Sequence, residues 1–266
     1  MNKSDNSILV ESEAGVRTIT LHRPEVLNAF NADLMAALGE AVREAEEDRA
    51  VRCVLLTGSG RAFCSGQDLA EYSGRLDSDD PLDLESRLRD EYNPVISRIR
   101  MMEKPVIASV NGVAAGAGCG LAVACDLRIA GESASFIQAF INIGLVPDCG
   151  STFMLPRLVG VGRAMELTFT GRRVAAAEAL EMGLVNRVVP DKELPDEANR
   201  FAQQLAAAPT RAIGLTKRMI NAAWTADLQA QLELEATLQT PATRTDDHRE
   251  GIRAFLEKRP PQFKGH

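Results

Sequence analysis

The 266-residue chain contains few of the residues that build disulfide frameworks, metal centres and histidine-based catalytic sites. Its five cysteines are odd in number, form no C-x-x-C pair and lie in apolar or glycine-rich surroundings. This pattern predicts reduced thiols and a cytoplasmic protein. His22 precedes a proline turn, His248 lies among charges and His266 ends the chain. No carboxylate-histidine cluster has metal-ligand spacing, so we expect no metal site and no histidine catalyst.

The sequence also lacks an excess of positive charge and an uninterrupted apolar helix. Lys+Arg 30 against Asp+Glu 37 gives a net charge of −7, which argues against nucleic-acid or anionic-membrane binding but allows a local basic pocket. No apolar core of signal-peptide length opens the chain, so we expect no export. An uncharged run, Val106 to Cys125, approaches membrane-spanning length. Asn111-Gly112 breaks it and glycines are spread through it, so we expect no membrane span.

Predicted strands alternate with helices up to Val189, and only helices follow Pro190. This order predicts an α/β core over residues 1–194 and a helical region over 195–266 that packs on its own core or on a neighbour. Pro209 and Pro241 are expected to separate helices in that region. We predict strands at 8–10, 16–21, 51–56, 106–110, 127–130 and 185–189, and helices at 32–45, 88–102, 163–167, 175–182, 195–208, 211–223, 228–238 and 246–258.

Two glycine-rich segments let another molecule approach the backbone closely. In the stretch 104–126, the β-branched run Val106–Val110 predicts a buried strand, and small residues then lead into a helix. The first N–H groups of a helix lack internal partners and can hold an anion, or an oxygen that becomes one. The second segment, Thr57–Leu69, follows another predicted strand. Both segments are therefore candidate parts of a binding site.

The central stretch has two other possible interpretations, a dinucleotide-binding loop and tight helix packing. A dinucleotide-binding loop needs a third glycine where Leu121 stands, and the phosphate-loop Lys-Ser/Thr is absent. Both observations argue against a nucleotide site. Tight helix packing without any ligand stays open on this stretch alone.

Several motifs, in order along nearly the whole chain, resemble the crotonase (enoyl-CoA hydratase/isomerase) superfamily. These are HRPEVLNAF, GSGRAFCSGQDL, KPVIASVNGVAAGAGCG and REGIRAFLEKRPPQF. The segments GLVPDCGSTFMLPRLVG and LELEATLQ are similar to the phenylacetate-pathway isomerase branch of that superfamily.

The resemblance implies a spiral of ββα turns with a C-terminal trimerising helical region, assembled as a trimer or a dimer of trimers. It implies a coenzyme A thioester as substrate, with no tightly bound cofactor. Two backbone N–H groups would hold the thioester oxygen. By motif position they belong to Gln67, after Gly66, and to Ala117, after Gly116.

A base is also required, because the N–H groups cannot move a proton. Hydratases of the superfamily use two glutamates, at positions held here by Gly120 and Phe140, so we expect no hydration by that mechanism. Asp148 stands where isomerases and dehalogenases of the superfamily carry a functional aspartate. From the local sequence alone, Asp148 is an ordinary turn residue or the N-cap of a helix beginning near Ser151.

With the resemblance, Asp148 becomes the candidate acid/base. It would move a proton between two carbons of the bound acyl chain while the enolate is held by the two N–H groups. Apolar neighbours would raise its pKa; the candidates are Phe136, Phe140, Val146 and Phe153. The expected activity is isomerisation of an enoyl-CoA or a ring-epoxide phenylacetyl-CoA thioester.

Coenzyme phosphates need local cations on an acidic protein. By motif position Arg23 is one candidate, and Phe255 and Lys258 resemble residues that reach a neighbouring subunit's coenzyme. Lys258 is otherwise a solvated residue near a helix end. The acidic segment 71–83 is either a lid or a plain solvated loop.

Two rival functions remain. In a dehalogenase or hydrolase, Asp148 would be the nucleophile; that branch shares glycine at position 120, but its tryptophan is Phe140 here, and Trp224 lies elsewhere. In a non-catalytic CoA-thioester-binding protein, the missing glutamates would reflect lost activity. Turnover of a thioester panel separates these functions.

Overall fold

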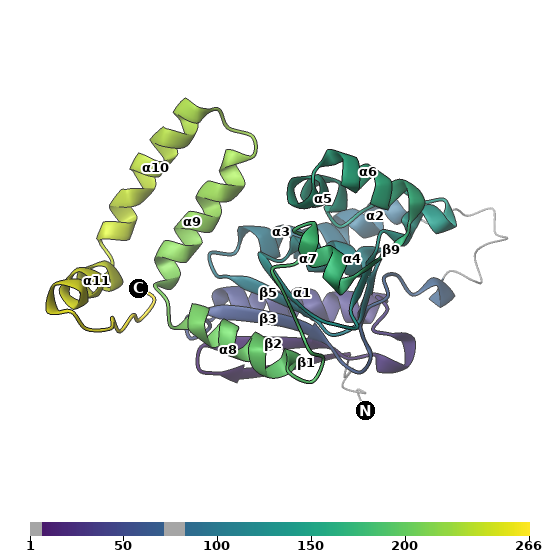
Figure 1. Ribbon diagram of the computed structural model, residues 1–266, viewed down its shortest axis with the longest axis horizontal. Helices are drawn as coiled ribbons and strands as arrows, with labels where there is room; N and C mark the ends of the chain where they lie inside the picture. Colours follow the sequence, from purple (N-terminus) through teal and green to yellow (C-terminus); the bar gives the residue numbers. More distant parts are fainter. Residues whose placement is uncertain (1–6, 72–82) are drawn as a thin grey trace.

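The computed structural model describes residues 7–71 and 83–266 and shows two sheets flanked by helices, with three helices extending from one side (Figure 1). The larger sheet has the strand order β1-β2-β3-β5-β7-β10. Its first two strands form the predicted antiparallel hairpin, and the following pairs are parallel. The strands are β1 (Ile8–Glu13), β2 (Val16–Leu21), β3 (Cys53–Gly58), β5 (Val106–Val110), β7 (Leu127–Gly131) and β10 (Arg187–Val189).

A second sheet of three-residue strands lies beside the first. Its order is β4 (Ala62–Cys64), β6 (Val113–Ala115), β8 (Ser135–Ile137) and β9 (Arg173–Ala175). Each of β3, β5 and β7 is followed by one strand of this second sheet, and helices connect successive pairs. The chain therefore winds as a spiral of ββα turns, the predicted architecture.

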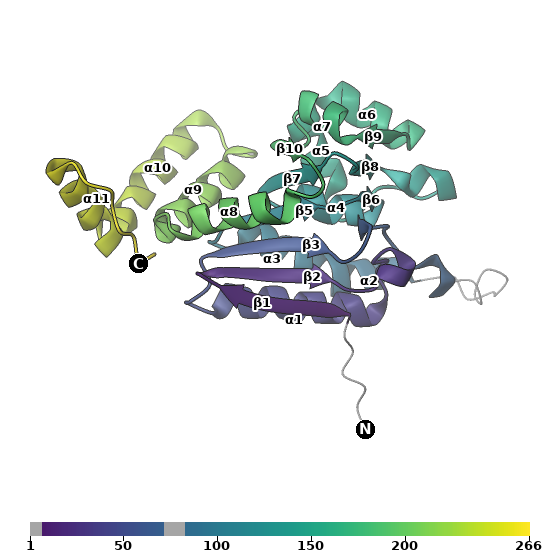
Figure 2. The same ribbon diagram turned by 60° about the horizontal axis from the view of Figure 1, so that its bottom comes forward.

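Helices cover both faces of the larger sheet (Figure 2). On one face lies α1 (Ala32–Glu47), which begins as predicted because the Asn31 side chain accepts a hydrogen bond from the Leu34 N–H at 2.9 Å. On the other lies α8 (Leu194–Ala206), whose Ala198 and Ala202 pack against apolar strand residues such as Leu55. Burial on both faces explains why the central parallel strands are continuously apolar.

The predicted helix at 88–102 is a composite. It consists of α2 (Leu84–Arg87), a π-helical turn η3 (Leu88–Tyr92) and α3 (Asn93–Met101). Beyond β6 the chain forms α4 (Ala117–Ala124), the 3-10 helix η4 (Ala139–Ile143), α5 (Ser151–Val159), α6 (Val161–Thr170) and α7 (Ala176–Glu181); a short 3-10 turn, η1, spans Pro24–Val26.

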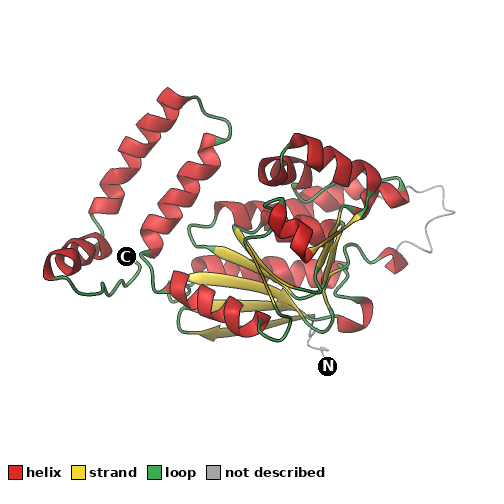
Figure 3. Ribbon diagram, viewed as in Figure 1, coloured by secondary structure: helices red, strands yellow, loops and turns green. Residues whose placement is uncertain are grey.

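Three C-terminal helices, α9 (Thr210–Ala223), α10 (Leu228–Thr243) and α11 (Asp246–Glu257), extend away from the sheets as an arm (Figure 3). Lys217 of α9 anchors the arm, since its Nζ donates to the carbonyl of Ile99 and to the carboxylate of Asp126, both at 2.7 Å. On α10, Leu228 and Leu232 are 75% and 48% exposed. The arm thus presents an apolar surface within a single chain.

Some local expectations were wrong. The short strands β4, β6, β8 and β9 were not predicted, and α6 is longer than the expected 163–167. Pro241 does not end a helix, because α10 continues through it to Thr243. The candidate lid at 71–83 lies almost wholly outside the described residues, which resume at Asp83.

Candidate active site

The two glycine-rich segments meet where β4 and β6 end. Gly66 has φ +96°, and a Cβ built on it would lie 2.8 Å from the carbonyl oxygen of Ala115 and 3.5 Å from the amide nitrogen of Ala117. Only glycine fits so close to a neighbouring backbone with this φ. The approach brings together the two loops that the sequence proposed as a pair.

The amides of Gln67 and Ala117 are both available as donors. The preceding glycine, Gly116, has φ +50° and donates its own N–H to the carbonyl of Ile137 at 2.9 Å. Within the described residues, neither the Gln67 N–H nor the Ala117 N–H donates a hydrogen bond. Ala117 is also the first residue of α4, where the helix dipole favours negative charge. Backbone amides in such a position can hold an oxygen that develops negative charge.

Asp148 lies in the turn that leads into α5. Its carbonyl accepts the Ser151 N–H at 2.9 Å, and Cys149 and Gly150 both have positive φ. Burial raises the pKa of the Asp148 carboxyl above its ordinary value. Its Oδ1 is buried without a hydrogen-bond partner in the described structure. An unsatisfied buried carboxyl oxygen is costly and is typical of functional sites.

The two positions of the hydratase glutamates are filled in different ways. A Cβ on Gly120 would lie 2.6 Å from the Cβ of Cys149, so the Asp148 turn occupies the space that a side chain would need. Phe140 is buried, and its Cζ lies 4.0 Å from where a Cβ on Gly116 would be. An aromatic ring therefore lies beside Gly116, at the position where the family resemblance places a hydratase carboxylate.

Two of the four residues expected to form an apolar wall around Asp148 are buried and two are exposed in the single chain. Phe136 and Phe140 are buried, but Val146 is 81% exposed in the single chain. Phe153 packs against Trp224 with ring centroids 5.2 Å apart and planes tilted by 59°. The sequence pattern could not separate these cases, because neighbouring apolar residues in irregular segments point in different directions.

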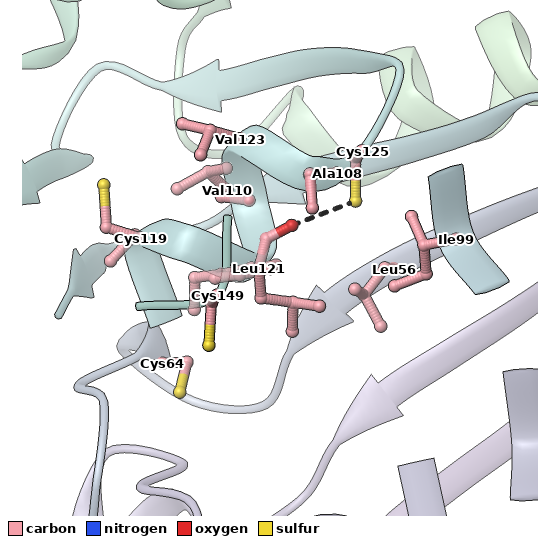
Figure 4. Packing of buried hydrophobic residues seen from close by; sticks show 14 of the residues in the cluster. Leu56, Cys64, Ile99, Ala108, Val110, Cys119, Leu121, Val123, Cys125 and Cys149 are labelled. Carbon is pink, nitrogen blue, oxygen red and sulfur yellow. Dashed lines mark hydrogen bonds between the residues drawn. The ribbon is translucent and has the colours of Figure 1, made fainter. Parts of the chain in front are cut away.

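The cysteines are unsuited to nucleophilic catalysis. All five are free and buried, and Figure 4 shows Cys64, Cys119 and Cys149 around α4, with Cys125 at its far end. Burial raises the pKa of the thiols of Cys64 and Cys119 to about 12 and that of Cys149 well above its ordinary value. Because the thiolate is the reactive form, these residues act in packing.

The three candidate coenzyme residues lie in different surroundings. The guanidinium of Arg23 pairs with Asp68 at 3.0 Å and donates to the carbonyl of Ala29 at 2.6 Å, so its charge already has a partner beside the Gln67 loop. Phe255 is 82% exposed, and Lys258 caps α11 in the left-handed conformation with φ +56°. Both lie on the arm, away from α4 and α5 (Figure 1). Their contact with coenzyme stays a prediction.

Two residues near the site were not recognised from the sequence. Asn28, within the HRPEVLNAF motif, is fully buried with φ +56°, and its side-chain amide donates to the carbonyls of Ala62 and Phe63 at 2.8 and 3.2 Å. Tyr92 donates to the side-chain oxygen of Gln67. For Asn28 the only signal in the sequence was an asparagine within a turn motif. For Tyr92 the sequence carried no signal.

Across residues 7–71 and 83–266, no group of three His, Cys, Asp or Glu side chains could hold a metal ion. Within the same ranges, no helix has both the length and the apolarity needed to cross a membrane.

A ββα spiral whose two glycine-rich loops adjoin at Gly66 and Ala117 defines a crotonase-fold protein. The family model "Enoyl-CoA hydratase/isomerase" matches residues 11–266, and the chain belongs to that family. It is 48% identical over 259 residues to "1,2-epoxyphenylacetyl-CoA isomerase" of Escherichia coli (strain K12), covering 97% of this chain and 98% of the relative. It is 45% identical to "Probable enoyl-CoA hydratase" of Rhodobacter capsulatus, covering 98% and 99%.

Solved structures agree with this assignment. The enoyl-CoA hydratase of Bacillus anthracis superposes with a TM-score of 0.91 at 37% identity, covering 98% of this chain and 100% of that structure. The resemblance drawn from the motifs is thereby confirmed, including the spiral fold. Relatives named as isomerase and as hydratase both occur, so the reaction has to be argued from the site.

Proposed function

We propose that this protein is an acyl-CoA isomerase that stabilises a thioester enolate with the N–H groups of Gln67 and Ala117 and uses Asp148 as acid and base. One observation carries the proposal. Two backbone N–H groups in adjoining loops donate no hydrogen bond within the described residues, and the same site contains a carboxyl, that of Asp148, whose pKa is raised by burial. Each positioned donor is typically worth about 2.7 to 4 kcal/mol in such a transition state.

In the proposed reaction, the ionised Asp148 removes a proton from the carbon next to the thioester carbonyl of a 3-enoyl-CoA. The electron pair moves to the thioester oxygen, where the two N–H groups hold the negative charge. Asp148 then returns the proton to the far carbon of the dienolate, and the double bond ends up conjugated with the carbonyl. No atom is gained or lost, so no second substrate is needed. A raised pKa suits a group that must both accept and donate the proton near neutral pH.

Isomerisation is favoured over hydration because the two positions of the hydratase glutamates hold glycine and phenylalanine here. Gly120 has no room for a side chain beside Cys149, and Phe140 places a ring near Gly116. Water activation would need a second acidic group that these positions do not supply.

The likeness to an epoxyphenylacetyl-CoA isomerase supports a ring-epoxide phenylacetyl-CoA as the substrate, with double-bond shifts as a second activity. For the epoxide, the protonated form of Asp148 would assist ring opening at the oxygen while the thioester is held at the same amides. The ring of Phe140, whose Cζ lies 4.0 Å from a Cβ built on Gly116, would be an apolar neighbour for an aromatic acyl group held at that loop.

The proposal includes assembly with further copies of this chain, as a trimer or a dimer of trimers. The arm exposes large apolar side chains that a partner would cover, namely Leu228, Leu232, Ile252, Phe255 and Leu256. A neighbouring subunit would then receive Phe255 and Lys258 at its coenzyme. Lys258→Ala should weaken coenzyme affinity in the assembled protein; unchanged affinity argues against this role.

The decisive experiment compares the wild type with Asp148→Asn on a 3-enoyl-CoA and on the ring-epoxide thioester, with proton exchange followed in heavy water. Loss of both activities by about a hundredfold or more is expected, as for removal of a general base. The exposed Asp196→Asn is the matched control. Near-unchanged isomerisation removes the role of Asp148. Rapid-quench mass spectrometry that finds an arylated Asp148 points instead to the nucleophilic function, and binding without turnover of any thioester points to a non-catalytic protein.

A further inference from the structure

The side chain of Gln67 is held at both ends. Its Nε2 donates to the carbonyl of Phe30 at 2.8 Å, and its Oε1 accepts a hydrogen bond from the hydroxyl of Tyr92. A glutamine whose donor and acceptor are both engaged cannot rotate without losing a hydrogen bond. Its backbone amide, the donor proposed for the thioester oxygen, is correspondingly restricted.

Phe30 is the shared anchor of this loop. Its N–H donates to the carbonyl of Gly66 at 2.7 Å, and its carbonyl also accepts the N–H of Asp68 at 2.9 Å. These two bonds flank the peptide of Gln67 and form an isolated parallel bridge. The rings of Phe30 and Tyr92 meet edge to face, with centroids 5.9 Å apart and planes at 85°. Tyr92 therefore supports the loop through its hydroxyl and through its ring.

The place of Tyr92 in its helix is unusual. It ends the π-helical turn η3 (Leu88–Tyr92), between the α-helices α2 and α3. Successive residues of an α-helix are turned by about 100°, so the wider π turn changes the direction in which Tyr92 points. Tyr92 is only 3% exposed. A π turn that directs one buried hydroxyl at a loop glutamine is the kind of local irregularity found at functional sites.

We propose that Tyr92 is a positioning residue, which aims the Gln67 N–H at the thioester oxygen through the Gln67 side chain. This inference rests on the proposed function. Tyr92 touches neither the substrate nor Asp148 in this scheme. Loss of its hydroxyl should reduce polarisation of the thioester carbonyl, and with it kcat, without changing coenzyme binding or the pH profile.

Tyr92→Phe tests the inference, because it keeps the ring packing on Phe30 and removes one hydroxyl. We expect kcat for a 3-enoyl-CoA to fall about fivefold to tenfold, the size of one hydrogen bond, with KM and the acid limb of the pH profile unchanged. In a Gln67→Met background the same change should have no further effect. Thr168→Val, which removes a hydroxyl bonded within α6, is the control and should retain wild-type kcat.

The infrared carbonyl band of a bound thioester tests the role of Tyr92 separately from the proposed oxyanion site. A saturated hexanoyl-CoA labelled with carbon-13 at its carbonyl binds without turnover. Its carbonyl band should shift to lower frequency on the wild type and shift less on Tyr92→Phe. No shift on the wild type would overturn the oxyanion site itself. A full shift on Tyr92→Phe with unchanged kcat would overturn the role of Tyr92 and leave the proposed function standing.

Discussion

Gly120 lies so close to Cys149 that a Cβ on Gly120 would be 2.6 Å from the Cβ of Cys149. The same Cβ would lie 3.0 Å from the Oγ of Ser151. The turn that carries Asp148 therefore rests directly on the backbone of α4, the helix whose first amide is proposed to hold the thioester oxygen. The Gly120 contact therefore helps to fix the position of Asp148, the proposed acid/base, relative to the proposed donor at Ala117.

Gly120→Ala should separate these two groups. Overpacking of this kind costs about 1 to 3 kcal/mol. Because the neighbour is the Cβ of Cys149, which cannot move without the main chain of the Asp148 turn, isomerase activity should fall more than stability alone explains. Thermal unfolding and kcat are the measurements. Gly162→Ala in α6, where an added Cβ meets nothing within 4 Å, should keep wild-type activity and stability. A fully active, fully stable Gly120→Ala would contradict the rigid contact.

Asp148→Asn should lose activity and gain stability. Because burial raises its pKa, the folded protein keeps a proton that the unfolded chain has lost between the ordinary and the raised pKa. The free energy of unfolding therefore falls as pH rises across that interval. The asparagine variant avoids this loss, so its Tm should exceed the wild-type Tm at neutral pH and match it at pH below the ordinary range of aspartate. A lower Tm at neutral pH would contradict this account.

Asn28→Ala should destabilise the fold strongly. It removes the bonds to the carbonyls of Ala62 and Phe63 and places alanine at φ +56°. Unsatisfied buried groups and left-handed backbone together should cost about 2 to 4 kcal/mol. Urea denaturation measures the loss, with the exposed Asn199→Ala of α8 as control. A change below about 0.5 kcal/mol, the usual size for a surface site, would show that other groups hold β4.

Lys217→Met should loosen the arm. Lys217 is 9% exposed and pairs with Asp126, which keeps contacts with Arg100 at 3.3 Å and with the Val106 N–H at 2.9 Å. Breaking a buried pair usually costs about 3 to 5 kcal/mol. Because Asp126 keeps its other partners, the cost of Lys217→Met should lie near the lower end of that range. Limited proteolysis should cut the arm sooner than in the exposed control Lys192→Met. Equal cleavage rates would mean that the arm is held elsewhere.

The elements best predicted from the sequence are those with a repeated pattern or a local signal. Asn31 caps α1 as expected, and the hairpin of β1 and β2 follows from alternation around Ala14-Gly15. The four short strands of the second sheet escaped prediction because three residues carry too little periodicity. The π turn at Leu88–Tyr92 was not predicted, because its residues follow an ordinary helical pattern.

Some features of the candidate site could likewise be predicted from the sequence, and others could not. Glycine patterns and the motif resemblance indicate Gln67, Ala117 and Asp148 as site candidates from the sequence alone, and the family comparison agrees with the fold that the resemblance implied. The pairing of Arg23 with Asp68 and the exposure of Val146 were beyond the sequence. Both depend on which surfaces meet after folding.

By itself, then, the sequence determined an α/β core, a helical C-terminal region and two glycine-rich loops, because backbone freedom and apolar periodicity are local properties of the chain. The ββα spiral and the candidate role of Asp148 came from the family resemblance of its motifs. Only the tertiary structure decided that Gly120 seats the Asp148 turn and that Tyr92 holds Gln67. These contacts join residues 25 or more positions apart. Long-range packing of this kind follows from the whole fold, and no local pattern encodes it.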